Sequence, residues 1–545
     1  MKIKSKIYGL HILFTLLFVA ISANITIGST PEWNVEFGKK VNWMQLTPTG
    51  HLIVSTDEGL AAVDPESGDI MWRDENLKKL KQEMFDLIPF TQFAVINKSK
   101  GILGSQNRMI VFDYVEGVEK WNSDKLDIIS SLGQFIVPSQ NALLVHGRNK
   151  KGKDWPRLVN LETGDLIWEN PDFFKKRKPT MFKLRGAKVA LMGNQEPLYD
   201  SDETMITCMN GKAIRKWNLK TGEMIWETEL KELRKAAPAP NYGYTSILHD
   251  KDAGIIYVPA VKSLYAIKTS DGSKVWGDKP AKLNGMAYQL RFVDDGILVK
   301  GGPNSAGKDG KPFVMLLDKA SGENKWKKPF TKLKGSTGFM VKENKAYMYS
   351  NKKVIVLNIA DGSFEEFTDK IKFKGKETPS TMRLTEKGFL LKSTQNLMMI
   401  GHDGSMVYHT YHKPLGGSLL GKIATTAVIT AINVGSAMDA SARANAAAQR
   451  SASGRGSASY SLITSNPYLS KRFTATKSTA DYSYILTKVE TGDDKGSGIV
   501  KVNTLTGDTD GSIVLDDKKP VYEVDNIESK LFYVKDKKQI LCFKF

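Results

Sequence analysis

The stretch that decides the fold is "AAVDPESGDIMWRDE", residues 61–75. An apolar run meets a turn of the type Asp-Pro-Glu-Ser-Gly, and a second short run ends at Trp72. The device returns as "LVNLETGDLIWEN" from Leu158, "KWNLKTGEMIWET" from Lys216, "AIKTSDGSKVWGD" from Ala266 and "LLDKASGENKWKK" from Leu316. Because one chain repeats both the turn and the tryptophan, the sequence indicates an array of similar structural units.

The spacing of the repeat predicts the architecture. The glycines of the turns are Gly68, Gly117, Gly164, Gly222, Gly272, Gly322, Gly362, Gly404 and Gly507. Successive gaps are 49, 47, 58, 50, 50, 40, 42 and 103 residues. A period of about 40 to 50 residues is the length of four short strands with their turns, which is typical of one blade of a β-propeller. The last gap has double length, so it contains either a missed unit or an insertion.

Each position of the repeat has a physical role. An Asp or Asn usually lies four residues before the glycine, where its side chain can cap backbone N–H groups of the turn. The glycine supplies the positive φ that the hairpin connection needs. Four residues after it come the repeated aromatics Trp72, Trp121, Trp168, Trp226, Trp276, Trp326 and, in the Gly404 unit, Tyr408. The Gly362 unit departs from this rule, with Glu366 at that position and Phe367 next.

The repeated tryptophans are predicted to be structural. Six of the ten tryptophans of the chain occupy this one position. Equivalent positions around a ring cannot all face one ligand, whereas an indole at a strand end can cover the edge of the neighbouring blade while its N–H finds a partner. We therefore expect them to join blade to blade.

The two ends of the chain are predicted to form one blade together. The C-terminal "SKLFYVKDKKQILCFKF" provides a second and a third strand but no fourth, and "EWNVEFGKK", near the start, is a single fourth strand containing Trp33. Their pairing would hide the strand edges that otherwise favour aggregation. The sequence thus predicts an all-β chain with one closed propeller over residues 31–545. Nine turns and the shared blade give ten blades, although eight is the commoner number for such repeats.

The N-terminus resembles a secretory signal peptide over residues 1–23. Lys2, Lys4 and Lys6 precede an apolar run that ends in small residues. The alternative is an uncleaved anchor helix. We expect export to the periplasm, the cell envelope or the exterior of a bacterium. Only Cys208 and Cys542 are present, which is too few for a disulfide framework, and the sequence leaves their pairing open.

The formal net charge of +19 allows a polyanionic partner such as a polysaccharide or a lipid surface. The lysines are scattered, however, and the densest runs, near Lys150 and Lys178, carry no nucleic-acid motif. We therefore expect no specific nucleic-acid binding, and we interpret the charge mainly as a contribution to solubility.

The segment 415–460 does not follow the repeat. Lys422 and Asp439 bracket sixteen uncharged residues in which apolar side chains step by three and four, the period of a helix. "SASGRGSAS" then has the composition of a flexible linker. We predict a helical insertion within the propeller. It either docks a partner, touches a membrane surface or covers one end of the ring.

The histidines His402, His409 and His412 gather in "GHDGSMVYHTYH" and are weak candidates for a metal site. On an extended strand His409 and His412 point to opposite faces, and His402 lies in the turn. We expect surface histidines rather than metal ligands.

The unit "LYAIKTSDGSKVW" and its repeats resemble those of the PQQ-like (quinoprotein-type) propeller superfamily. The resemblance implies the propeller fold. It is ambiguous about function, because that superfamily contains both pyrroloquinoline quinone-dependent dehydrogenases and non-catalytic scaffolds such as the propeller lipoprotein of the outer-membrane assembly machine. The chain lacks the adjacent Cys-Cys pair typical of many of these dehydrogenases, and it also lacks a cysteine for lipid attachment after the apolar run.

From these observations we expect a monomeric, exported, non-enzymatic scaffold without a cofactor. It would bind envelope or secreted proteins through its loops and the insertion at 415–460. The alternative is a quinone- or metal-dependent dehydrogenase, and a third hypothesis is a propeller that binds polyanions or carbohydrates.

Overall fold

The structure is a computed structural model, and it describes residues 30–88, 91–100, 106–172, 180–184, 187–191, 197–207, 213–230, 247–260, 262–294, 296–303, 310–415, 481–491, 494–515, 517 and 520–545. The predicted signal peptide and all but the first residue of the predicted insertion lie outside these residues. Among the residues described, no helix has the length and apolar character needed to cross a membrane.

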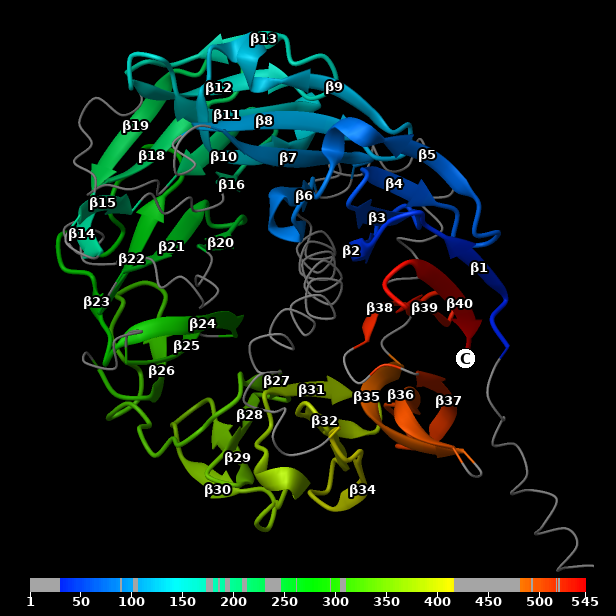
Figure 1. The fold of residues 1–545 in the computed structure, drawn as a ribbon. Coiled ribbons are helices and arrows are strands. Elements are labelled where there is room, and N and C mark those ends of the chain that lie inside the picture. Colours follow the sequence, from blue (N-terminus) through cyan, green and yellow to red (C-terminus); the bar gives the residue numbers. More distant parts are fainter. Residues whose placement is uncertain are drawn as a thin grey trace, which may run out of the picture.

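The described chain forms the ten blades of a β-propeller around a central axis, each an antiparallel set of three or four strands (Figure 1). One parallel pair, Ser130 with Asn107, joins blades 2 and 3 into a larger sheet. Consecutive apolar runs are joined by short polar turns, so each strand pairs with the next one along the chain. Within a blade the first strand lies nearest the axis and the last lies at the outer edge. The prediction of an all-β propeller, with ten blades by the repeat count, is confirmed.

Blades 1 to 3 have four strands each. Blade 1 consists of β2 (Val41–Leu46), β3 (Leu52–Thr56), β4 (Leu60–Val63) and β5 (Ile70–Asp74). Blade 2 consists of β6 (Phe85–Leu87), β7 (Phe93–Lys100), β8 (Gln106–Asp113) and β9 (Val118–Asn122). Blade 3 consists of β10 (Ser130–Val137), β11 (Ala142–Arg148), β12 (Asp154–Asn160) and β13 (Leu166–Glu169). A separate hairpin, β14 (Thr180–Leu184) with β15 (Ala187–Leu191), follows.

Blades 4 to 6 continue the ring. Blade 4 consists of β16 (Leu198–Tyr199), β17 (Thr204–Thr207), β18 (Ala213–Asn218) and β19 (Met224–Glu229). Blade 5 consists of β20 (Leu248–Asp250), β21 (Ile255–Pro259), β22 (Ser263–Lys268) and β23 (Ala281–Lys282). Blade 6 consists of β24 (Met286–Val293), β25 (Gly296–Gly302) and β26 (Phe313–Asp318). Its outer segment forms only isolated bridges, Leu317 with Asn324 and Val314 with Phe330.

Blades 7 to 10 complete the ring. Blade 7 consists of β27 (Met340–Lys342), β28 (Lys345–Ser350), β29 (Lys353–Asn358) and β30 (Phe364–Glu366). Blade 8 consists of β31 (Thr381–Thr385), β32 (Gly388–Lys392), β33 (Asn396–Ile400) and β34 (Met406–Tyr411). Blade 9 consists of β35 (Tyr482–Thr491), β36 (Asp494–Asn503) and β37 (Thr509–Leu515). Blade 10 consists of β38 (Val521–Asp525), β39 (Lys530–Lys535), β40 (Gln539–Lys544) and, from the other end of the chain, β1 (Trp33–Glu36).

Short 3-10 turns connect some of these strands. They are Glu75–Leu77, Gln82–Met84, Ser123–Leu126, Pro138–Gln140 and Lys374–Lys376.

The core of the molecule is a continuous series of apolar clusters between blades. Nine buried clusters each contain side chains of at least two neighbouring blades, and together they span every junction of the ring. One of them joins blades 9, 10 and 1. Because burial of apolar surface is the main favourable term in folding, each blade is stabilised chiefly by its two neighbours.

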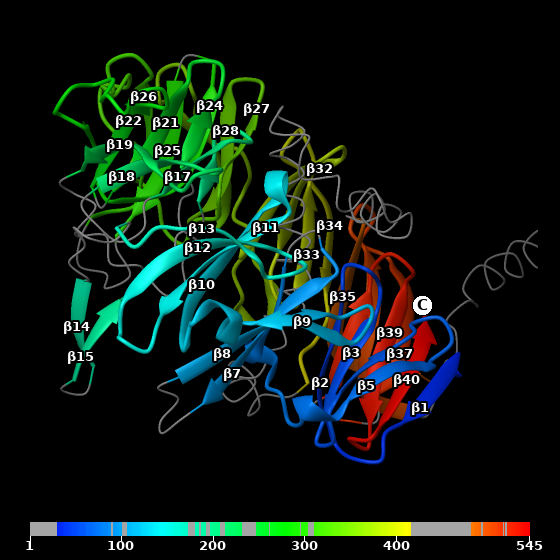
Figure 2. The same ribbon diagram turned by 90° about the horizontal axis from the view of Figure 1, so that it is seen from above.

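The first and last strands of the chain are neighbours. β1 pairs antiparallel with β40, with Trp33 opposite Cys542 and Glu36 opposite Gln539. Figures 1 and 2 both place blue β1 beside red β40. The N-terminal strand is therefore the outer strand of blade 10, and it joins the chain's two ends into one sheet.

Candidate functional site

The junctions between blades are built around the repeated tryptophans. At seven of the ten junctions an indole at the outer edge of one blade lies over the turn glycine of the next blade, and its N–H donates to the carbonyl three residues before that glycine. Trp72, for example, lies over Gly117 and donates to Tyr114 O at 3.1 Å. The same arrangement joins Trp33 to Gly68, Trp121 to Gly164, Trp168 to Gly222, Trp226 to Gly272, Trp276 to Gly322 and Trp326 to Gly362. We call these residues the seam tryptophans.

The turn glycines are required for two reasons. All nine have φ between 70° and 83°, a region that other residues rarely adopt. A Cβ atom added to any of the seven under a seam tryptophan would also lie 2.4–2.7 Å from an indole carbon. The sequence predicted the first reason but not the second.

The Asp or Asn four residues before the glycine caps the turn. Asp64 Oδ1 accepts hydrogen bonds from Glu66 N at 2.7 Å and Ser67 N at 3.1 Å. Asp113, Asn160, Asn218, Asp318 and Asn503 do the same in their own turns, and Asn358 accepts one such bond. The turn is thus fixed locally and presents its glycine to the preceding blade.

A β-bulge precedes the aromatic position in six outer strands. In blade 3, Leu166 is opposite Val159 and Trp168 is opposite Leu158, so Ile167 has no partner of its own. The corresponding bulged residues are Met71, Lys120, Ile225, Val407 and Asp510. Such a bulge re-aims the following side chain and disrupts the exposed strand edge. In five of these strands, the bulged residue directly precedes the aromatic residue that packs on the next blade.

Three junctions depart from the pattern. Between blades 8 and 9, Tyr408 replaces tryptophan and donates to Thr504 O at 2.6 Å. Between blades 7 and 8 there is no indole, and Phe367 packs on Phe389 instead. Between blades 9 and 10, Gly511 takes the aromatic position and faces Phe545. Two of these junctions follow the Gly362 and Gly404 units, which the sequence marked as irregular, and the one at Gly511 was not predicted. All three are still packed, but with different side chains.

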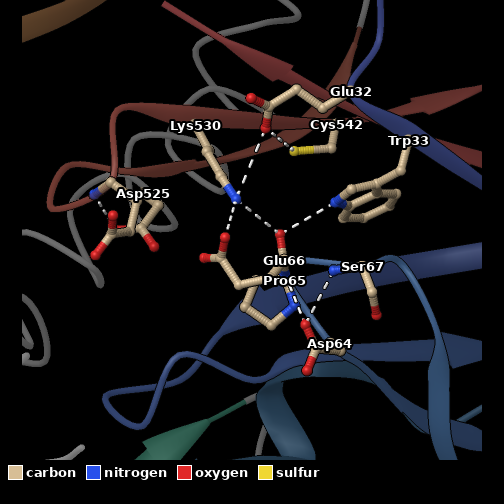
Figure 3. A network of polar contacts seen from close by, with 10 residues as sticks. Glu32, Trp33, Asp64, Pro65, Glu66, Ser67, Asp525, Lys530 and Cys542 are labelled. Carbon is tan, nitrogen blue, oxygen red and sulfur yellow. Dashed lines mark hydrogen bonds and ion pairs between the residues drawn. The ribbon is translucent and has the colours of Figure 1, made fainter.

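A buried lysine holds the N-terminal strand, blade 10 and blade 1 together (Figure 3). Lys530 Nζ lies 2.7 Å from Glu66 Oε2, 3.3 Å from Pro65 O and 3.7 Å from Glu32 Oε2. Trp33 Nε1 donates to the same Pro65 carbonyl at 3.1 Å. The ammonium group of blade 10 thus contacts two other segments, the N-terminal strand's neighbour Glu32 and the first turn of blade 1, and we call this network the closing clasp.

The charge of Lys530 is stabilised by its surroundings. Burial alone lowers its pKa, but the hydrogen bond and charge of Glu66, with Cys542 and Glu32 nearby, raise the pKa above its ordinary value. The adjacent Cys542 is a buried free thiol, whereas Cys208 lies outside the described residues. Burial raises the pKa of Cys542 to about 12, so its thiol is poorly reactive while blade 10 stays closed.

Replacing Lys530 with Met is expected to loosen this closure. The change removes charge-assisted hydrogen bonds, which contribute about 2 kcal/mol. In a Cys208→Ser background, alkylation of Cys542 should then become faster than in the parent. A lysine with a raised pKa stabilises the fold below its unfolded pKa, and this contribution is lost as the pH rises through the raised value. The parent should therefore lose its protection at alkaline pH, and the variant should show a smaller pH effect.

The control for this experiment is Lys125→Met. Lys125 also bridges two blades, through Asp165 Oδ1 at 2.6 Å, but both side chains are exposed, so this pair contributes little. Equal alkylation rates in the parent and the Lys530 variant would show that the clasp does not hold the ends together.

The three histidines do not form one site. His402 Nδ1 lies 3.3 Å from Lys342 Nζ, and His409 Nε2 lies 2.9 Å from Asn396 Oδ1. Burial, and next the charge of Lys374, lower the pKa of His409, while burial lowers that of His412. Across the part of the chain that the structure describes, no group of three His, Cys, Asp or Glu side chains is arranged to hold a metal ion.

His409 belongs to a polar network on blade 8. Asn396 Nδ2 donates to Glu377 Oε2 at 2.8 Å, and Ser393 Oγ donates to the same oxygen at 2.5 Å. Lys374 N donates to Asn396 Oδ1 at 3.0 Å. These bonds fix the loop before β31 to the sheet. His409 contacts the same Asn396 side chain, so its role is structural.

The exposure of the residues just before the aromatic position was not predicted from the sequence. Nine of the eleven exposed large hydrophobic residues in the described structure lie on outer strands: Met71, Val118, Leu166, Ile167, Met224, Ile225, Phe364, Met406 and Val407. A signal for them was present in the recurring triplets "IMW", "LIW", "MIW" and "MVY". As apolar residues in predicted strands, they would be expected to be buried.

These seams and the ring that they close define the class of protein, a ten-bladed β-propeller. A family model described as the EMC1 N-terminal beta-propeller domain matches residues 158–305, which run from blade 3 into blade 6. No curated protein sequence matches the chain.

Solved structures align with the chain at low similarity. BamB from Moraxella catarrhalis has 14% sequence identity and a TM-score of 0.34, and the alignment covers 69% of this chain and 98% of BamB. The computationally designed Ika8 protein has 10% identity and a TM-score of 0.31, with 69% and 97% covered.

Proposed function

We propose that this chain is a non-enzymatic scaffold that holds partner proteins on a rigid ring. The observation that carries the proposal is the position of the exposed apolar side chains. Six of them lie on outer strands that also carry a seam tryptophan, so the ring presents them at repeated, defined places. Exposed apolar residues that recur at equivalent positions are typical of interaction surfaces.

Two further points support a protein-binding role. The match of residues 158–305 to the EMC1 N-terminal propeller model is a likeness to another propeller domain. The repeat also resembles that of the PQQ-like superfamily, and this superfamily contains non-catalytic scaffolds. On the sequence alone, we assign the segment 415–460 as a second element for partner docking, and we place the monomeric protein in the bacterial cell envelope.

The test separates this proposal from the quinone-dependent alternative. The full chain, purified after export, is incubated with pyrroloquinoline quinone and Ca²⁺ and examined for a bound chromophore and for oxidation of alcohols and sugars. We expect neither. The same protein, immobilised, should retain one or more defined proteins from solubilised envelopes. Turnover with the quinone, or retention of nothing beyond what a basic control protein retains, would contradict the proposal.

A further inference from the structure

The outer rim of blades 1 to 4 combines exposed apolar residues with an excess of acidic groups. Six of the nine exposed hydrophobic residues on outer strands lie on these four consecutive blades, on β5, β9, β13 and β19. Figure 1 shows these strands following one another along the outer edge of the ring. We call this surface, with the turns that precede the strands, the acidic rim.

The charge of the acidic rim is opposite to that of the whole protein. The ranges 64–74, 113–122, 160–169 and 218–229 contain 13 carboxylates and three basic residues. The full chain has 78 basic and 59 acidic residues. On blades 5 and 6 the balance reverses, because 268–279 and 318–328 contain four carboxylates and seven lysines. The acidity is therefore a property of one part of the ring's edge.

Part of this negative charge is neutralised internally. Six of the 13 carboxylates form ion pairs, which are Glu66–Lys530, Glu116–Lys120, Glu119–Arg108, Asp165–Lys125, Glu169–Arg157 and Glu227–Arg215. Three others, Asp69, Glu162 and Glu223, form no ion pair with any described residue. Asp69 and Glu223 directly precede β5 and β19, and Glu162 lies in the turn before β13.

Blades 3 and 4 carry the strongest form of the pattern. Leu166 and Ile167 are 50% and 43% exposed, and Met224 and Ile225 are 49% and 48% exposed. In each blade the second residue is bulged out of the ladder. Because a bulge disrupts pairing along the free edge, a partner would be recognised mainly by these side chains rather than by strand addition.

From this combination we infer that the acidic rim of blades 1 to 4 binds a protein segment in which lysine or arginine alternates with aliphatic residues. The aliphatic groups of the partner would cover the exposed pairs, and its cations would meet the unpaired carboxylates. The inference rests on the proposed scaffold function and adds the place and the chemistry of the contact. An anionic lipid surface, a nucleic acid or an acidic polysaccharide would be repelled by this face.

The test uses defined peptides. A labelled peptide of about twelve residues that alternates lysine with leucine and valine is titrated with the full chain, and its anisotropy is recorded at about 0.15 M salt and again at high salt. A peptide with glutamate in place of lysine serves as the charge control. We expect the lysine peptide to bind, the glutamate peptide not to bind, and binding to weaken with salt.

Two matched double variants locate the contact. Ile167→Lys with Ile225→Lys should weaken binding about tenfold or more, because the new cations replace apolar contacts and repel the peptide. Met406→Lys with Val407→Lys changes the equivalent positions of blade 8, which are 61% and 52% exposed. Only one carboxylate lies within residues 400–411 there, so the affinity should change less than about twofold.

Three outcomes would overturn the inference: stronger binding of the glutamate peptide, equal losses in both double variants, or no loss in either. All the substituted side chains are exposed, and equal thermal midpoints of the variants would show that folding is intact. If neither variant loses the peptide while the parent still retains partner proteins, only the acidic rim is wrong. If the parent retains no partner, the scaffold function itself is wrong.

Discussion

Replacing Trp326 with alanine is expected to destabilise the protein by about 3–5 kcal/mol, the usual cost of removing a large aromatic side chain from a core. The indole is 3% exposed, lies over Gly362 and belongs to the cluster between blades 6 and 7. Its N–H donates to Ile359 O at 2.8 Å, and the variant leaves this carbonyl without that donor. Urea denaturation followed by tryptophan fluorescence and circular dichroism measures the loss.

Trp155→Ala is the control for this substitution. Trp155 is not at a seam; it lies partly exposed beside Arg157 and donates to Glu169. Its removal should cost about 1 kcal/mol or less. If the two variants were equally stable, the tryptophans would not be what joins one blade to the next.

Gly117→Ala is expected to destabilise the protein by about 2–5 kcal/mol, because it strains the backbone and displaces the seam indole of Trp72. The backbone at Gly117 has φ of 76°, and an added Cβ would lie 2.4 Å from atoms of the Trp72 ring. The backbone conformation alone costs about 1–2 kcal/mol for a residue with a side chain, and forcing the ring away adds about 1–3 kcal/mol. Denaturation midpoints of the parent and the variant provide the measurement.

Gly152→Ala separates the two contributions. Gly152 has a similar φ of 71°, but no atom lies within 4 Å of its added Cβ. This variant should show the backbone cost alone. A Gly117 variant no less stable than the Gly152 variant would mean that the indole moves aside freely, contrary to a tight seam.

Most of the fold could be predicted because each blade repeats a local signal. Asp64, Gly68 and Trp72 recur in order with their spacing, and the period of about 40 to 50 residues fixes the number of strands per blade. The incomplete ends of the chain also predicted a shared blade, and β1 pairs with β40. These features depend on residues that are close in the sequence or on the spacing of the repeat, and both can be determined directly from the sequence.

What could not be predicted depends on contacts between distant residues. The sequence did not indicate that Trp72 lies on the glycine of the next blade, because that contact spans more than 40 residues. Lys530 was one lysine among many until the structure placed it beside Glu66, more than 460 residues away. The bulge at Ile167 depends on the register between β12 and β13, which a small change of pairing would alter.

The measurement that tests the central claim most directly is native mass spectrometry of the protein isolated from the cells that make it. A scaffold should appear as a complex whose mass exceeds that of one chain by at least one further polypeptide. Chemical crosslinking of the same sample should then link that polypeptide to residues of the acidic rim or of the segment 415–460. A single chain carrying a small organic cofactor, with no second polypeptide, would contradict the account.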